Sequence, residues 1–101
     1  MRFTIDYINK HLKIIYFYFI MNKGYIRSYG KKAITIETSN LYQYYAPYQN
    51  VEDLIIPFLK DSSKYPILVT FEIDRSNSAG LANGKKRYYA SNVKIDDTII
   101  L

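Results

Sequence analysis

The sequence predicts an all-β domain of five strands with one short helical interruption. Apolar and polar residues alternate along several short segments, and only one segment repeats apolar residues at the spacing of a helix. The length of 101 residues suits one compact domain rather than two. Because 49% of the residues are hydrophobic, a disordered chain is not expected.

The first three expected strands lie in the N-terminal half of this pattern. Residues 23–30, KGYIRSYG, form the first strand. Residues 33–38, AITIET, place Ile34 and Ile36 on the same face of the second strand. Residues 41–48, LYQYYAPY, form a third, tyrosine-rich strand, which stops near its proline because proline cannot donate to a strand ladder.

Two further strands are expected in the C-terminal half. Residues 65–74, YPILVTFEID, carry the strongest strand pattern, with Phe71 and Ile73 on one face. A turn-rich loop of Ser, Asn and Gly, residues 75–84, separates it from the fifth strand, residues 85–95. The final DDTIIL shows no clear pattern.

One segment, residues 50–61, breaks the strand pattern. Its apolar residues follow helical spacing and are Val51, Leu54, Ile55, Phe58 and Leu59. Asn50 and Asp53 resemble a capping pair at the start of a helix, and Pro57 limits its length. We expect a short helix or broken turn that plugs the open end of the domain with its apolar side, Leu54 included.

Five strands with a helical piece between the third and the fourth follow the order of a small OB-type barrel. An SH3-like barrel would contain similar strands. Only the position of the helical insert argues against that alternative.

The first twenty residues do not match the rest of the chain. They contain the run IIYFYFI, which is too short to span a bilayer, since a span needs roughly 20 apolar residues. The run resembles a signal-peptide core, but no small-x-small cleavage site follows it. We expect residues 21–101 to form the working domain of a cytoplasmic protein, with residues 1–20 an atypical segment outside it. An added strand or helix, or a membrane-facing anchor, are the alternatives for that segment.

The composition excludes several kinds of catalytic and metal-binding chemistry. The chain has no Cys, so it has no disulfide, no thiolate metal site and no thiol nucleophile. Its single histidine, His11, excludes a multi-histidine metal site. Glu52–Asp53 and Asp96–Asp97 are sequence neighbours whose side chains diverge, so neither pair suits acid–base catalysis. We therefore expect a protein that is not an enzyme and that uses no metal and no cofactor.

Positive charge is concentrated near the C-terminal end. The chain has a formal net charge of +5, and the stretch GKKRYYASNVKI contains four cations and no acid. Cations beside a pair of tyrosines favour a polyanionic partner such as nucleic acid. A solvated strand edge that resists aggregation is the alternative.

Several segments, in their order along the chain, are similar to the segments of one known family. GYIRSYG is similar to an opening strand Gly-x-Val-Lys-Trp-Phe, and YYAPYQNV to a segment Val-Phe-Val-His-Phe-Ser-x-Ile. VTFEI and the later YASNVKI are similar to a fourth strand and a closing Ala-x-Asn-Val. On these segments, Gly24 to Ile95 resembles a divergent cold-shock domain, which is a small OB barrel. That family binds single-stranded RNA or DNA by stacking bases on aromatic side chains over a basic sheet face.

The resemblance implies aromatic binding positions at Tyr29, Tyr45 and Tyr48, each of which falls where the family has Phe. The departures, at positions where the family has Trp, two Phe and His, are Ser28, Ala33, Thr35 and Pro47. They remove several stacking rings, so the resemblance implies weak, sequence-tolerant binding.

Two functions follow for such a barrel. The first is a single-stranded nucleic-acid-binding module whose cations contact phosphates while its tyrosines stack bases. Its predicted binding residues are Arg27, Tyr29, Lys31, Lys32, Tyr45, Tyr48, Lys85, Lys86 and Arg87. The second is a small protein-interaction barrel, an accessory or regulatory factor, whose tyrosines form a partner surface.

Overall fold

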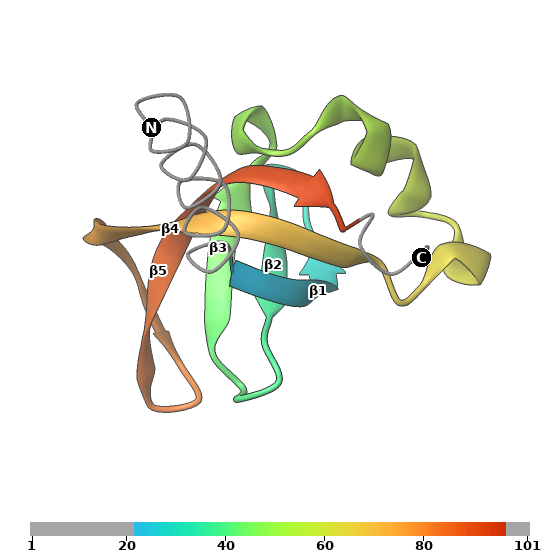
Figure 1. Cartoon of the computed structure of the whole chain (residues 1–101). Helices are drawn as coiled ribbons and strands as arrows, with labels where there is room; N and C mark the ends of the chain where they lie inside the picture. The colour runs from blue at the N-terminus through green and yellow to red at the C-terminus, as the bar shows by residue number, and fades with distance from the viewer. Residues whose placement is uncertain (1–21, 97–101) are drawn as a thin grey trace, which may run out of the picture.

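A computed structural model describes residues 22–96 of the chain, and these form five strands and three short 3-10 turns. The strands are β1 (Asn22–Tyr29), β2 (Ala33–Glu37), β3 (Gln43–Pro47), β4 (Leu68–Ala82) and β5 (Lys85–Ile95). The turns η1 (Tyr48–Asn50), η2 (Asp53–Phe58) and η3 (Ser62–Lys64) connect β3 to β4 and lie together on one side of the strands (Figure 1).

The strands close into a barrel in the order β1-β2-β3-β5-β4, with β4 pairing back onto β1. The β3–β5 pair is parallel, and the other pairs are antiparallel. This topology confirms the predicted all-β fold, a closed five-stranded barrel consistent with the OB type.

Alternate residues of the strands fill the barrel interior. Ile34 and Ile36 of β2 are fully buried and pair with Ala46 and Tyr44 of β3. The Phe71 ring packs against the Tyr44 ring, with 5.0 Å between their centroids. Burial alternates as expected along β3, whereas in β2 Ala33 and Glu37 on the opposite face are buried as well and only Thr35 is partly exposed.

The expected short helix or broken turn is built from 3-10 turns, and this changes which of its residues are buried. Residues three apart in a 3-10 helix lie on the same side. Ile55 and Phe58 therefore face the barrel, where Ile55 is fully buried and Phe58 packs on the core. Leu54 and Pro57 share the other side, and Leu54 is 56% exposed. The prediction that Leu54 is buried is wrong.

The start of this segment is fastened to β5. The Asn50 side-chain amide donates to the carbonyl of Ala90 at 3.1 Å, so it does not act as the predicted helix cap. Buried Val51 forms an isolated bridge with Val93. The Glu52 backbone N–H donates to the Val93 carbonyl at 2.9 Å. The turns are thereby held over one end of the barrel, as expected for a plug.

The prediction of a loop at residues 75–84 is wrong over most of its length, because β4 continues through it and pairs with β5. Only Asn83 and Gly84 form the turn, with φ of 55° and 74°. Asn-Gly adopts such left-handed conformations readily in two-residue hairpins. The ladder is irregular next to Asp74, whose carboxylate accepts from the Ser76 backbone N–H at 3.0 Å. The resulting β4–β5 ribbon extends well beyond the barrel (Figure 1).

Two sequence-based expectations concern the ends of the chain. The atypical segment of residues 1–20 and the boundary at Met21 lie outside the described residues. Within residues 22–96, no helix is long and apolar enough to cross a membrane.

Candidate functional site

Tyr45, one of the predicted binding residues, lies on the outer face of the barrel. It points away from the core because Tyr44 and Ala46, on either side of it, are buried inside. The Tyr89 ring of β5 meets the Tyr45 ring edge-on, with centroids 5.5 Å apart. The guanidinium carbon of Arg87 lies 5.1 Å from the Tyr45 ring centroid. These three side chains form one continuous surface, which we call the β3–β5 platform (Tyr45, Arg87 and Tyr89).

Arg87 is held in a fixed position on this platform. Its Nε and Nη2 atoms both donate to the carbonyl oxygen of Ala79, at 3.1 and 2.7 Å. Among residues 22–96, no carboxylate forms an ion pair with it. Its positive charge therefore remains available to an anion.

Asp74 lies at one edge of the platform, because it is the partner of Tyr89 in the β4–β5 register. Its carboxylate accepts hydrogen bonds from Ser76 and from the Asn77 side chain. These bonds hold the pKa of Asp74 below its ordinary value. The platform is therefore bordered by a negative charge at neutral pH, and a polyanion would be kept to its β3 side.

Tyr29 and Tyr48 lie close together near the β1–β2 turn, apart from Tyr45. The Tyr48 hydroxyl donates to the Gly30 carbonyl, and its backbone N–H donates to the Lys32 carbonyl at 3.1 Å. Burial raises the pKa of the Tyr48 hydroxyl, and the neighbouring Tyr29 phenol raises it further. Tyr48 thus fastens the end of β3 to the turn that carries exposed Lys32.

The two rings line a hollow of about 470 Å³ on this side of the barrel. Ile56 and Leu59 supply apolar wall, and Lys31 stands at its edge with a second lysine, Lys60. Tyr29 remains 44% exposed. The hollow suits a flat apolar group that carries negative charge nearby.

Lys85 and Lys86 lie at the tip of the β4–β5 ribbon, beside the start of β3. The Lys85 ammonium is 4.1 Å from the centroid of the Tyr42 ring and donates to the Asn40 carbonyl at 3.3 Å. Lys86 is exposed. The ribbon tip therefore folds back onto the β2–β3 turn and brings two cations to this end of β3.

Arg27 differs from the other predicted cations because it already has an acidic partner. Its Nη1 atom forms an ion pair with Glu37, whose side chain is only 1% exposed. The hydrogen bond that Arg27 donates to the Glu37 carboxylate raises the pKa of Arg27 above its ordinary value. Arg27 thus compensates a buried carboxylate, and its charge is balanced locally.

The predicted residues do not form a single patch, but they follow one line. The ribbon tip lies at the start of β3, the β3–β5 platform at its middle, and the β1–β2 turn at its end. Tyr29 and Tyr48 share the last of these places. Arg27 lies to one side, in its pair with Glu37.

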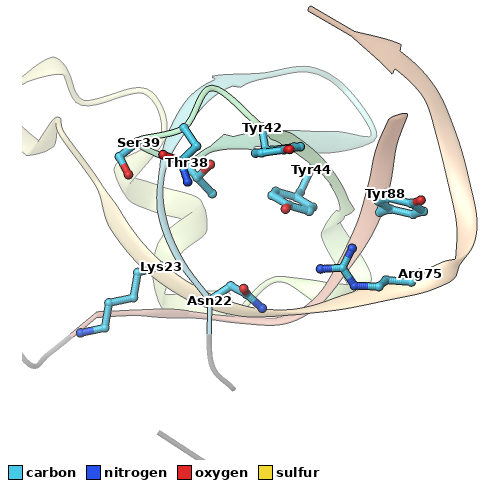
Figure 2. A pocket seen from close by; sticks show the side chains of 9 residues that line it. Asn22, Lys23, Thr38, Ser39, Tyr42, Tyr44, Arg75 and Tyr88 are labelled. Atoms are coloured by element: carbon cyan, nitrogen blue, oxygen red, sulfur yellow. The ribbon is translucent and has the colours of Figure 1, made fainter. Parts of the chain in front are cut away.

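Sequence reasoning did not find a pocket at one end of the barrel, which we call the end pocket. It has a volume of about 460 Å³, and its walls include Asn22, Thr38, Tyr42, Tyr44, Arg75 and Tyr88 (Figure 2). The alternation of Tyr42 and Tyr44 on one face was visible in the sequence. The sequence predicts a loop at Arg75, and its position beside Tyr88 depends on the pairing of β4 with β5.

Residues 22–96 contain no group of three or more His, Cys, Asp or Glu side chains that could hold a metal ion. Comparisons of the chain with protein-family models, with curated proteins and with solved structures found no match.

Proposed function

We propose that the protein binds single-stranded RNA or DNA along the outer face of β3, as a weak, sequence-tolerant module of the cold-shock type. The observation that carries the proposal is the β3–β5 platform, in which Arg87 lies over the Tyr45 ring and Tyr89 abuts it. Bases stack on aromatic rings and on arginine guanidinium planes. Because every base has a π-face, such a platform accepts any sequence.

Lysines at both ends of the platform support a path for the phosphates. Lys31 and Lys32 belong to the β1–β2 turn, and Lys85 and Lys86 to the ribbon tip. An extended strand rises about 3.3 Å per residue, so the tip and the turn are roughly 20 Å apart along β3. That length suits a short run of nucleotides, and OB folds bind about 4 to 16 of them. OB barrels use this face, between these two loops, for oligonucleotides.

In this proposal Arg27 stabilises the fold and does not contact a phosphate. It is engaged with Glu37, so freeing it for a phosphate would leave a buried carboxylate without its cation. We therefore assign the phosphate contacts to Arg87 and the four lysines, and assign to Arg27 the stabilisation of the β1–β2 edge.

A protein-interaction barrel is the second candidate. Exposed apolar side chains favour it, namely Leu54 and Ile56 on η2 and Leu41 and Leu81 near the ribbon tip. Contacts of this kind depend little on salt, whereas each phosphate contact releases counterions and makes binding strongly salt-dependent.

The test is a fluorescence-anisotropy titration of the full chain with labelled single-stranded RNA and DNA at about 50 and about 200 mM salt. The proposal predicts binding of both polymers at the lower salt and a large loss of affinity at the higher. If the folded protein binds no single strand at low salt, the proposal fails and the protein-interaction barrel becomes the better account.

A further inference from the structure

The end pocket differs from the β3–β5 platform in place and in chemistry. It opens at the end of the barrel, between the start of β1, the β2–β3 turn and the β4–β5 ribbon (Figure 2). Tyrosine rings, hydroxyl groups and amides line it together with two cations, and none of its lining residues within the described range 22–96 is acidic. Its volume of about 460 Å³ lies within the usual range of small-ligand sites.

Arg75 is the cation that gives the pocket its polarity. Its guanidinium carbon lies 5.7 Å from the Tyr88 ring centroid, and the group points into the pocket (Figure 2). No acidic side chain within the described part of the chain, residues 22–96, forms an ion pair with Arg75. The other lining cation, Lys23, already pairs with Asp96 at 3.7 Å. Arg75 therefore presents an uncompensated charge to whatever enters.

The charge of Arg75 also acts on Tyr44, whose ring forms the floor of the pocket. Burial raises the pKa of the Tyr44 hydroxyl, and the Arg75 charge partly opposes that effect. Tyr44 is itself held in place, because its ring packs on Phe71 at 5.0 Å between centroids. The pocket thus has a rigid aromatic floor close to a positive charge.

Two further rings form walls above this floor. Tyr42 lies on one side of Tyr44, and Tyr88, the partner of Tyr44 in the β3–β5 register, lies on its other side beside Arg75 (Figure 2). The Lys85 ammonium lies 4.1 Å from the centroid of the Tyr42 ring, and Tyr88 packs on the core, so both rings are restrained. Thr38 and Ser39 add hydroxyl groups at the rim. Flat aromatic surfaces, a guanidinium and hydroxyl groups together match a planar ring joined to a phosphorylated sugar.

We propose that the end pocket binds one nucleotide unit, with its base against Tyr42 and Tyr88 and its phosphate on Arg75. The unit is either a free nucleoside monophosphate or the terminal nucleotide of a strand. The proposal does not depend on strand binding at the β3–β5 platform, because the two sites use different residues.

The first experiment is an NMR titration of the full chain with uridine monophosphate and adenosine monophosphate. The controls are uridine, which lacks the phosphate, and ribose 5-phosphate, which lacks the base. The proposal predicts that the monophosphates shift the Tyr42, Tyr88 and Arg75 signals and bind at least about tenfold more tightly than either control, since a charge-assisted hydrogen bond is lost in one and stacking in the other. Unchanged signals at saturating monophosphate, or equal binding of ribose 5-phosphate, would overturn it.

Matched variants distinguish the loss of a contact in the pocket from the loss of one positive charge elsewhere on the protein. Arg75→Gln should weaken monophosphate binding about tenfold, the loss expected for one charge-assisted hydrogen bond. Lys94→Gln removes the same charge from an exposed position at the far end of β5 and should have no effect. Tyr42→Phe should bind like the parent, whereas Tyr42→Ser should bind about tenfold or more weakly because it loses a stacking ring. Equal affinities for Arg75→Gln and Lys94→Gln, with both proteins folded, would refute the assignment.

A last comparison identifies the source of the nucleotide and keeps the two proposed sites distinct. Linear and circular single strands of equal length are titrated while the Tyr88 signals are followed. Given monophosphate binding, shifts with linear but not with circular strands assign the site to a strand end. Shifts with the monophosphate but with neither kind of strand assign it to a free nucleotide. Tyr45→Ala should leave monophosphate binding intact, so a failure of strand binding at the platform would not be mistaken for a failure of the pocket. Loss of monophosphate binding in Tyr45→Ala would contradict a separate pocket.

Discussion

Among single residues, Arg87 has the most direct part in the proposed function. Two hydrogen bonds to the Ala79 carbonyl fix its guanidinium over Tyr45 before any ligand arrives. A side chain that is already ordered loses less conformational entropy on binding than a free one. Arginine also offers a plane for stacking, which lysine lacks. The platform is therefore prepared to contact both a base and its phosphate.

Tyr45 provides the direct test of stacking at this platform. Tyr45→Ala should weaken oligonucleotide binding by about 1–3 kcal/mol, the usual contribution of one stacked base. Tyr45→Phe keeps the ring and should bind nearly as well as the parent. Anisotropy titrations measure both affinities, and thermal melts confirm that both variants fold. If the two folded variants lost affinity equally, stacking on the ring would be excluded.

The ion pair of Arg27 and Glu37 leads to a prediction about stability. Arg27→Gln removes the cation from a carboxylate whose side chain is 1% exposed, and should lower the free energy of unfolding by about 1–3 kcal/mol. Lys86→Gln makes the same charge change at an exposed position and should stay within about 0.5 kcal/mol. Urea unfolding measures the free energy of unfolding of both variants. Equal small effects would mean that this pair does not stabilise the fold.

At the scale of elements, η2 shows how backbone geometry decides which apolar residues are buried. The segment contains Pro57, which cannot donate the backbone hydrogen bond that an α-helix requires at that position. The turns instead use bonds between residues three apart, such as Ile55 N–H to the Glu52 carbonyl at 3.0 Å. The side chains three apart then align, and Leu54 is turned to solvent.

The burial pattern of η2 is tested by a pair of neighbouring substitutions. Ile55→Ala should cost about 2–5 kcal/mol of unfolding free energy, because it removes a fully buried side chain and leaves a cavity. Leu54→Ala should change it by no more than about 0.5 kcal/mol, since the side chain is mostly exposed. Chemical denaturation of both variants would measure the difference. A costlier Leu54→Ala would mean that the helical spacing had indicated the correct face after all.

The elements that could be predicted from the sequence are those with local signals. The alternation along β2 and β3 placed Ile34 and Ile36 inside and Tyr45 on the opposite face from Tyr44, as the barrel has them. The long β4 could not be found, because six of the eight residues of its second half, RSNSAGLA, are Ser, Asn, Ala or Gly, which have little strand preference. The Asn-Gly turn was the signal that could have revealed it.

The arrangement of the candidate sites depends on pairings between distant residues. Arg87 over Tyr45 requires the parallel β3–β5 pair, and Arg75 beside Tyr88 requires a ladder with several register shifts. Periodicity predicts which face a residue occupies, but it does not predict the register between strands that are far apart in the chain. The residue types of the predicted site could therefore be named in advance, and their grouping could not.

At the scale of the whole molecule, barrel closure is what brings the cationic groups onto one line. The parallel β3–β5 pair and the folded-back ribbon tip place Lys85, Lys86 and Arg87 beside β3, and the β1–β2 turn adds two lysines at its other end. Under the proposed function, a polyanion lying along β3 would pass close to these groups. This shared path is the central claim of the proposed function.

The slope of oligonucleotide affinity against salt concentration tests that claim most directly. The pair Lys85→Ser and Lys86→Ser removes two proposed phosphate contacts, so it should flatten the slope by about 1.4, at about 0.7 for each contact with a single strand. The matched pair Lys64→Ser and Lys94→Ser removes the same charge from exposed positions outside the path and should leave the slope close to that of the parent. Equal slopes for the two folded double variants would contradict a nucleic-acid path along β3.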